Sequence, residues 1–128
     1  MRRVRRPLLA LIVLLAALAV GYGIRALDPA HSAHIPTVSL RSVPPQVALT
    51  VRRIKNGGPF PYPEDDGVVF HNYEHALPSE PDGYYREYTV PTPGAPDRGA
   101  RRIVTGKDGT YYYTPDHYST FERLAVPR

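Results

Sequence analysis

The chain has 128 residues and no cysteine, which allows one domain and excludes a disulfide framework, thiol catalysis and thiolate-bound zinc. Its net charge of +4 arises at the N-terminus, because five of the sixteen basic residues precede Leu27 and all twelve acidic residues follow it. From Leu27 onward the chain has eleven basic and twelve acidic residues. The resulting net charge of −1 gives no support for nucleic-acid binding through net attraction.

The first 26 residues are typical of an export leader rather than of a folded domain. Four arginines between positions 2 and 6 precede an apolar run of 13 residues, Leu8–Val20. A basic start before a run of this length favours a cleaved signal peptide, because a spanning helix usually needs about 20 apolar residues. An uncharged extension to Ile24 leaves a retained anchor open, with membrane contact only through residues 7–24. Both interpretations predict a domain outside the cytoplasm, either secreted or membrane-anchored.

Residues 27–37 are predicted to be a linker, because prolines interrupt this stretch and it has no apolar periodicity. Two histidines, His31 and His34, lie in it. They lack a third ligand, so a solvated linker is preferred to a metal site. The domain is expected to occupy residues 38–128.

One helix is predicted at the start of the domain. Ser42 is interpreted as its N-cap, and Val47, Val51 and Ile54 follow at the i, i+4, i+7 spacing of an apolar helix face. Gly57-Gly58 is expected to end the helix. Its basic side chains are interpreted as the solvated outer face of a core helix rather than as an RNA-binding surface.

Five short strands are predicted after the helix, separated by turn residues. They are Val68–His71, Tyr84–Val90, Arg101–Thr105, Thr110–Tyr113 and Tyr118–Phe121. This order predicts an α+β fold with one N-terminal helix packed on a small antiparallel β-sheet. The ten tyrosines are expected to fill the core of this cysteine-free domain. The acidic run Glu64–Asp66 is interpreted as a solvated turn, because three adjacent residues cannot all point at one calcium ion.

Glu87 lies in the middle of the clearest strand, where an unpaired charge is costly. Strand alternation places it on one face with Tyr85 and Thr89. Residue type alone leaves two interpretations open, a structural ion pair with Arg102 and a functional carboxylate. Alternation also means that only one of Arg101 and Arg102 can face Glu87.

Four residues could together carry chemistry on a phosphodiester. Glu87 would supply a base, His117 an acid, and Arg98 and Arg102 two cations for a phosphate. RNA cleavage by transesterification needs this set and neither a metal nor another cofactor. Composition alone does not select these four residues from other sets.

Seven short motifs follow one another along the domain: GPFPY at 58–62, DGVVF at 66–70, NYE at 72–74, GYYREYTV at 83–90, TPG at 92–94, RGARRI at 98–103 and DHYSTF at 116–121. With these motifs the chain closely resembles the bacterial guanyl-specific ribonucleases, the family of barnase and its smaller relatives. The similarity extends from about Thr37 to Phe121. It implies the microbial ribonuclease fold and cleavage of single-stranded RNA 3′ of guanosine, through a metal-independent transesterification that yields a 2′,3′-cyclic phosphate.

By position, the resemblance implies a role for each of the four residues. Glu87 corresponds to the general base that takes the proton of the 2′-hydroxyl. His117 corresponds to the general acid that protonates the departing 5′-oxygen. Arg98 and Arg102 correspond to the cations that bind the phosphate.

The resemblance also implies a base-recognition loop whose backbone N–H groups bind guanine O6. The loop consists of Val69, Phe70, His71, Asn72, Tyr73 and Glu74. Tyr118 corresponds to a tyrosine near the phosphate. The Glu74 carboxylate would accept hydrogen bonds from guanine N1–H and N2–H, which adenine does not offer as a pair. Tyr73 and Phe70 would supply ring faces for base stacking.

Some positions depart from the family pattern. His71 replaces a different polar residue, and Tyr73 stands where many bacterial members have arginine and fungal members have tyrosine. Ser39 occupies a position where some members have half of a disulfide.

The resemblance implies RNA as the substrate of a monomeric enzyme and a small acidic intracellular inhibitor like barstar as a candidate partner. Two other functions stay open, a catalytically inactive surface-anchored RNA- or protein-binding module and an antibacterial ribonuclease toxin. The presence of all four catalytic-type residues and of Glu74 argues against the inactive module.

Overall fold

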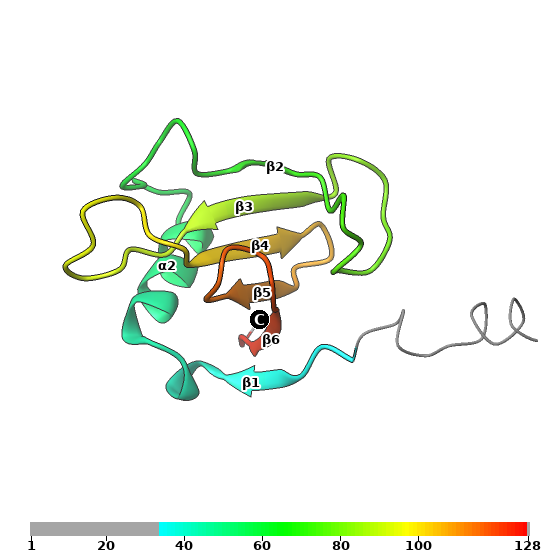
Figure 1. Ribbon diagram of the computed structural model, residues 1–128, viewed down its shortest axis with the longest axis horizontal. Coiled ribbons are helices and arrows are strands. Elements are labelled where there is room, and N and C mark those ends of the chain that lie inside the picture. The colour runs from blue at the N-terminus through cyan, green and yellow to red at the C-terminus, as the bar shows by residue number, and fades with distance from the viewer. Residues whose placement is uncertain (1–33, 128) are drawn as a thin grey trace, which may run out of the picture. The chain divides into compact units, whose positions relative to one another are not determined.

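The computed structural model describes residues 34–127, in which one α-helix packs on a six-stranded sheet of order β1-β6-β5-β4-β3-β2 (Figure 1). The strands are β1 (Thr37–Ser39), β2 (Val68–Phe70), β3 (Tyr85–Thr89), β4 (Arg102–Gly106), β5 (Tyr111–Thr114) and β6 (Glu122–Ala125). Strands β2 to β6 form an antiparallel meander, and β1 pairs with β6 in parallel. The predicted α+β fold is confirmed.

The predicted leader, residues 1–26, and residues 27–33 of the predicted linker lie outside the described residues. Within residues 34–127, no helix has both the length and the apolar character that a membrane span requires. The predicted linker ends at Thr37, which is the first residue of β1.

The helix, α2 (Pro45–Lys55), begins three residues after the predicted cap. Ser42 instead ends a short 3₁₀ turn, η2 (Leu40–Ser42), and its hydroxyl donates to the Ser39 carbonyl. Proline disfavours helical geometry in the residue before it, so Val43 and Pro44 are extended, and the helix starts at the second proline. The C-terminal end is as predicted. Gly57 has φ +74°, and its N–H donates to the Ile54 carbonyl.

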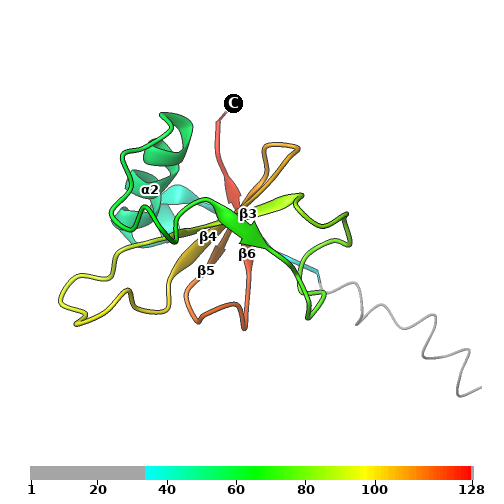
Figure 2. The ribbon, with the colours of Figure 1, turned by 90° about the horizontal axis from the view of Figure 1, so that it is seen from above.

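The main core lies between α2 and one face of the sheet (Figure 2). The predicted stripe contributes buried Val47 and Val51 and partly buried Ile54, which pack on buried residues of the sheet and of its connections. The sheet side of this cluster consists of Val90, Ile103, Tyr113 and Leu124. The basic side chains of the last helical turn lie outside this core, as expected for a solvated helix face.

A second core covers the opposite face of the sheet and uses tyrosines, as predicted. Tyr85 and Tyr112 are each 3% exposed there, together with buried Val104, Leu77 and Phe121. The Tyr85 hydroxyl donates to the Pro78 carbonyl at 2.6 Å, so burying this ring leaves its polar end satisfied. Because Leu77 and Phe121 come from connecting segments, this core fixes the loops on that face of the sheet.

One strand prediction was wrong, and one strand was missed. The last strand begins at Glu122 rather than Tyr118, because His117 and Tyr118 have φ of +54° and +75° and cannot continue a strand. Strand β1 was not predicted. It has three residues with only Val38 turned inward, too short a pattern for a period of two to be visible.

Candidate active site

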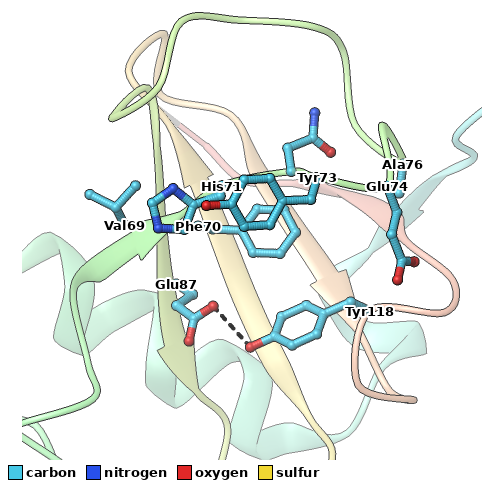
Figure 3. A pocket seen from close by; sticks show the side chains of 9 residues that line it. Val69, Phe70, His71, Tyr73, Glu74, Ala76, Glu87 and Tyr118 are labelled. Carbon is cyan, nitrogen blue, oxygen red and sulfur yellow. Dashed lines mark hydrogen bonds between the residues drawn. The ribbon is translucent and has the colours of Figure 1, made fainter.

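A pocket of about 230 Å³ is formed by β2 and the segment after it, by β3 and by the segment before β6 (Figure 3). It is lined by Val69, Phe70, His71, Asn72, Tyr73, Glu74, Ala76, Glu87 and Tyr118. These include all six residues of the predicted recognition loop. The pocket lies on the face opposite α2, because Glu87 shares its face of β3 with Tyr85 of the second core.

Asn72 gives the recognition loop its shape. It is 8% exposed and has φ +57°, a conformation that asparagine tolerates better than most residues. Its amide donates to the Leu77 carbonyl at 2.9 Å and accepts from the Leu77 N–H at 3.0 Å. The side chain is therefore occupied within the loop, which leaves the neighbouring backbone and side chains to line the pocket.

The other loop residues differ in how exposed they are. Phe70 is half-buried, and its ring stacks on Tyr118 with centroids 5.1 Å apart and an interplanar angle of 28°. Tyr73 is 81% exposed. Glu74 is exposed at the pocket, and its carboxylate has no hydrogen-bond partner among residues 34–127. It is therefore available to a ligand.

Among the described residues, Glu87 does not form the structural ion pair with Arg102 that residue type left open. The register of β3 and β4 does place Arg102 on its face, since Thr89 pairs with Arg102 and Glu87 with Val104. In the described part of the chain, however, the side-chain partner of Glu87 is Tyr118, whose hydroxyl donates to Oε2 at 2.9 Å (Figure 3). No cation among residues 34–127 forms a salt bridge with its carboxylate.

Tyr118 is protonated at neutral pH and therefore remains a hydrogen-bond donor. Burial, and then the negative charge of Glu87 and its hydrogen bond, raise the pKa of Tyr118 to about 12. The positive charge of Arg102 acts in the opposite direction but is smaller. Tyr118 therefore keeps its own proton and donates a hydrogen bond that holds the Glu87 carboxylate in place.

Arg102 is a buried cation with an unused donor. It is 3% exposed, and its Nη1 donates to the carbonyls of Gly99 at 3.0 Å and Arg101 at 2.8 Å. Its buried Nε has no partner among the described residues. Because a buried guanidinium without a counter-ion is costly, this arrangement favours an anionic ligand beside it.

Arg98 is held by three neighbours and is more exposed. Its Nη1 donates to Thr89 Oγ1 at 3.0 Å, its Nε lies 3.7 Å from Asp65 Oδ2, and its guanidinium carbon lies 5.9 Å from the centroid of the Tyr62 ring. Thr89 lies on the same face as Glu87 and pairs with Arg102. The structure thus brings both predicted phosphate-binding arginines to one end of β3.

His117 is exposed and does not line the pocket, but it adjoins two parts of the site. Its backbone N–H donates to the Ala100 carbonyl at 2.8 Å, which joins it to the segment that carries Arg98. The centroid of its ring lies 4.7 Å from that of Tyr118, the partner of Glu87. Tyr118 therefore contacts both the predicted base and the predicted acid.

Two positive φ angles at His117 and Tyr118 need support from their surroundings. Asp116 supplies it. Its Oδ2 accepts from the Thr120 hydroxyl at 2.6 Å, and its Oδ1 accepts from the Thr120 N–H at 2.8 Å and the Thr114 hydroxyl at 3.0 Å. The Thr120 hydroxyl and the other hydrogen bonds lower the pKa of Asp116.

We expect Asp116→Asn to lower the free energy of unfolding at neutral pH, because the amide cannot accept three hydrogen bonds as well as the carboxylate does. A lowered folded-state pKa means that the carboxylate stabilises the fold above its unfolded pKa, and that this is lost as the pH falls through the folded value. The difference between wild type and variant should therefore shrink in acid. Urea unfolding at a series of pH values measures it, and a difference independent of pH would contradict the assignment.

The acidic run before β2 does more than the solvated turn predicted for it. The Asp66 carboxylate accepts from the backbone N–H of Tyr62 at 3.1 Å and of Thr89 at 2.6 Å, and so ties the preceding loop to β3. Asp65 pairs with Arg98. The contacts with Thr89 and Arg98 join residues distant in sequence, so the local pattern gave no signal for them. Within residues 34–127, no group of three or more metal-ligating side chains occurs.

Known proteins resemble this chain in sequence. A family model described as ribonuclease matches residues 27–125. Guanyl-specific ribonuclease St of Saccharopolyspora erythraea is 55% identical over 89 residues, which are 70% of this chain and 86% of that protein. Guanyl-specific ribonuclease Sa of Kitasatospora aureofaciens is also 55% identical over 89 residues, 69% of this chain and 92% of that protein.

Solved structures resemble it in fold. A structure of ribonuclease Sa2 with mononucleotides has a TM-score of 0.69 and 47% identity, and covers 72% of this chain and 95% of that one. Ribonuclease Sa2 with guanosine-2′-cyclophosphate has a TM-score of 0.68 and 48% identity, and covers 73% of this chain and 98% of that one. With a family match across residues 27–125 and relatives more than half identical over most of their length, this chain belongs to the microbial guanyl-specific ribonuclease family.

Proposed function

We propose that this protein is an endoribonuclease that cleaves single-stranded RNA on the 3′ side of guanosine. The observation that carries this proposal is that one pocket is lined both by the recognition loop and by the Glu87 carboxylate. A base bound in the loop would place its own ribose beside a proton acceptor, which is the proximity that intramolecular attack requires. The guanyl specificity of the named relatives agrees with this proposal.

Base recognition falls to the segment from Val69 to Glu74. Backbone N–H groups of this segment bind guanine O6, and the free Glu74 carboxylate accepts from N1–H and N2–H. Adenine would leave that carboxylate unpaired, which accounts for discrimination. Phe70, supported by its stack on Tyr118, and exposed Tyr73 provide faces for the base.

The chemistry is a transesterification. Glu87 takes the proton of the ribose 2′-hydroxyl while the 2′-oxygen forms a bond to phosphorus. The bond from phosphorus to the 5′-oxygen breaks, and protonated His117 donates a proton to that oxygen. The products are a 2′,3′-cyclic phosphate and a free 5′-hydroxyl, and water can then open the cyclic phosphate slowly with the two roles reversed.

Arg98 and Arg102 stabilise the negative charge that grows on the phosphoryl oxygens. Arg102 contributes a buried guanidinium whose Nε has no hydrogen-bond partner among residues 34–127. Arg98 is oriented by Thr89 and Asp65 before substrate binds. Tyr118 keeps Glu87 directed toward the pocket.

The purified protein should cleave GpC in the presence of EDTA and release guanosine 2′,3′-cyclic phosphate, with ApC cleaved far more slowly. Chromatography of the products measures the rate of cleavage of each dinucleotide and identifies the cyclic phosphate. Loss of cleavage on chelation would overturn the metal-independent mechanism. Equal rates on GpC and ApC would overturn the assigned role of Glu74.

The leader and the site together indicate where the enzyme acts and which partner it could bind. The basic and apolar start of the chain supports export, with the domain secreted or held outside the cytoplasm by residues 7–24. The arginines of the site would suit a small acidic intracellular inhibitor, and the domain would act as a monomer. Sequencing the N-terminus of the exported protein tests the first point. An N-terminus downstream of Ile24 supports cleavage of the leader.

A further inference from the structure

His71 contacts two residues that the mechanism above does not connect. Its Nδ1 lies 2.7 Å from Oδ1 of Asp82, and its ring stacks on Tyr73 with centroids 4.9 Å apart and an interplanar angle of 8°. His71 and Tyr73 both line the pocket, and their rings lie together in Figure 3. Asp82 lies outside the pocket lining.

The backbone of the recognition loop brings the two rings together. Asn72, between them, has φ +57° and directs its side chain to the backbone of Leu77. His71 and Tyr73 are consequently both exposed beside the pocket. The stack is therefore a product of the same loop geometry that forms the pocket.

Asp82 is itself held in a defined place. The Tyr84 N–H donates to the Pro81 carbonyl at 3.1 Å, and Gly83 has φ +88°. A hydrogen-bonded four-residue turn with a left-handed third residue fixes Asp82 at its second position. This turn leads directly into β3, which carries Glu87. The contact from Asp82 to His71 thus joins the recognition loop to the strand of the proposed base.

We propose that His71, anchored by Asp82, is a positioning residue that holds the Tyr73 ring ready for the base. Tyr73 is 81% exposed, so without a neighbour its ring would sample several rotamers and lose that freedom when a base stacks on it. The stack on His71 restricts the ring before binding. This inference rests on the proposed function of the pocket, and it predicts an effect on substrate binding rather than on the chemical step.

Steady-state kinetics on GpC distinguish the two. His71→Ala should raise KM about two- to tenfold, the range expected from one aromatic pair, with kcat unchanged. Asp82→Ala should raise KM about two- to fivefold, as expected from one exposed polar contact. In the His71→Ala background, Asp82→Ala should add nothing, because Asp82 acts only through His71. His71→Phe keeps a ring for Tyr73 but offers Asp82 no donor, and its KM should lie between those of wild type and His71→Ala.

Glu80→Ala is the matched control, since it removes an exposed carboxylate two residues from Asp82 and should leave KM unchanged. Calorimetric titration with guanosine 3′-monophosphate should give the same ratios of Kd, and urea unfolding should show all variants folded. An unchanged KM in His71→Ala, a loss confined to kcat, or an effect of Asp82→Ala that persists without His71 would each overturn the inference. A wild type that does not cleave GpC would instead overturn the proposed function.

Discussion

Replacing Glu87 by glutamine is expected to lower kcat/KM on GpC by about 10²- to 10⁴-fold, the contribution typical of a positioned general base. Glutamine keeps an oxygen that can accept from the Tyr118 hydroxyl, so the local hydrogen bond can persist while the proton acceptor is lost. The free energy of unfolding should change by about 1 kcal/mol or less. Glu122→Gln, another half-buried strand glutamate, should retain full activity.

A substrate with a different leaving group distinguishes the role of the proposed base, Glu87, from that of the proposed acid, His117. His117→Gln should lower kcat/KM on GpC about as strongly as Glu87→Gln does. On guanosine 3′-(4-nitrophenyl phosphate), whose phenolate departs without a proton, His117→Gln should approach wild type and Glu87→Gln should remain impaired. Release of nitrophenolate measures both rates. If Glu87→Gln is rescued by the aryl ester and His117→Gln is not, the two roles are exchanged.

Replacing Arg102 by methionine is expected to lower kcat/KM by about 10²- to 10³-fold, the loss seen when one donor to a developing anion is removed. Arg102 is 3% exposed, and its Nε has no partner in the described part of the chain. Its removal relieves the burial of a charge but loses two hydrogen bonds to backbone carbonyls. These effects oppose each other, so the free energy of unfolding should change by about 1 kcal/mol or less.

The adjacent Arg101 provides the matched control. Burial raises the pKa of Tyr113, a residue of the core beside α2, and the positive charge of Arg101 opposes that shift. Arg102 opposes the rise in the pKa of Tyr118 in the same way, on the other face of the sheet. Arg101→Met should therefore retain kcat/KM within about threefold, the range of an ordinary surface substitution. Kinetics on GpC for both variants decide the matter. Similar losses in the two would show that general attraction of RNA, rather than a directed contact to phosphate, accounts for the effect.

Much of the fold could be predicted because its signals are local. The spacing of Val47, Val51 and Ile54 identified the helix, and the two glycines after it fixed its end. The alternation around Glu87 identified β3. The predictions failed where a longer-range or rarer feature decided the structure: consecutive prolines delayed the start of α2, and the support of Asp116 for two left-handed residues moved the start of β6.

The candidate site was located from motifs, but the contacts inside it were not. The recognition loop was assigned from positions 69 to 74, and these residues do line one pocket together with Glu87 and Tyr118. The link between Glu87 and Tyr118 spans 31 positions, and that between Asp66 and Thr89 spans 23. No local pattern encodes such pairs, because they depend on the register of strands and the paths of loops.

The sequence by itself determined the order of elements, the absence of thiol chemistry and the family resemblance, because each depends on residue type and on short spacings. Only the tertiary structure decided which charges are neutralised. It paired Glu87 with a neutral tyrosine, left the Arg102 Nε without a partner among residues 34–127 and joined Asp82 to His71. The physical reason is that the reactivity and affinity of a charged group depend on the few atoms within hydrogen-bond reach, which chain folding rather than sequence proximity selects.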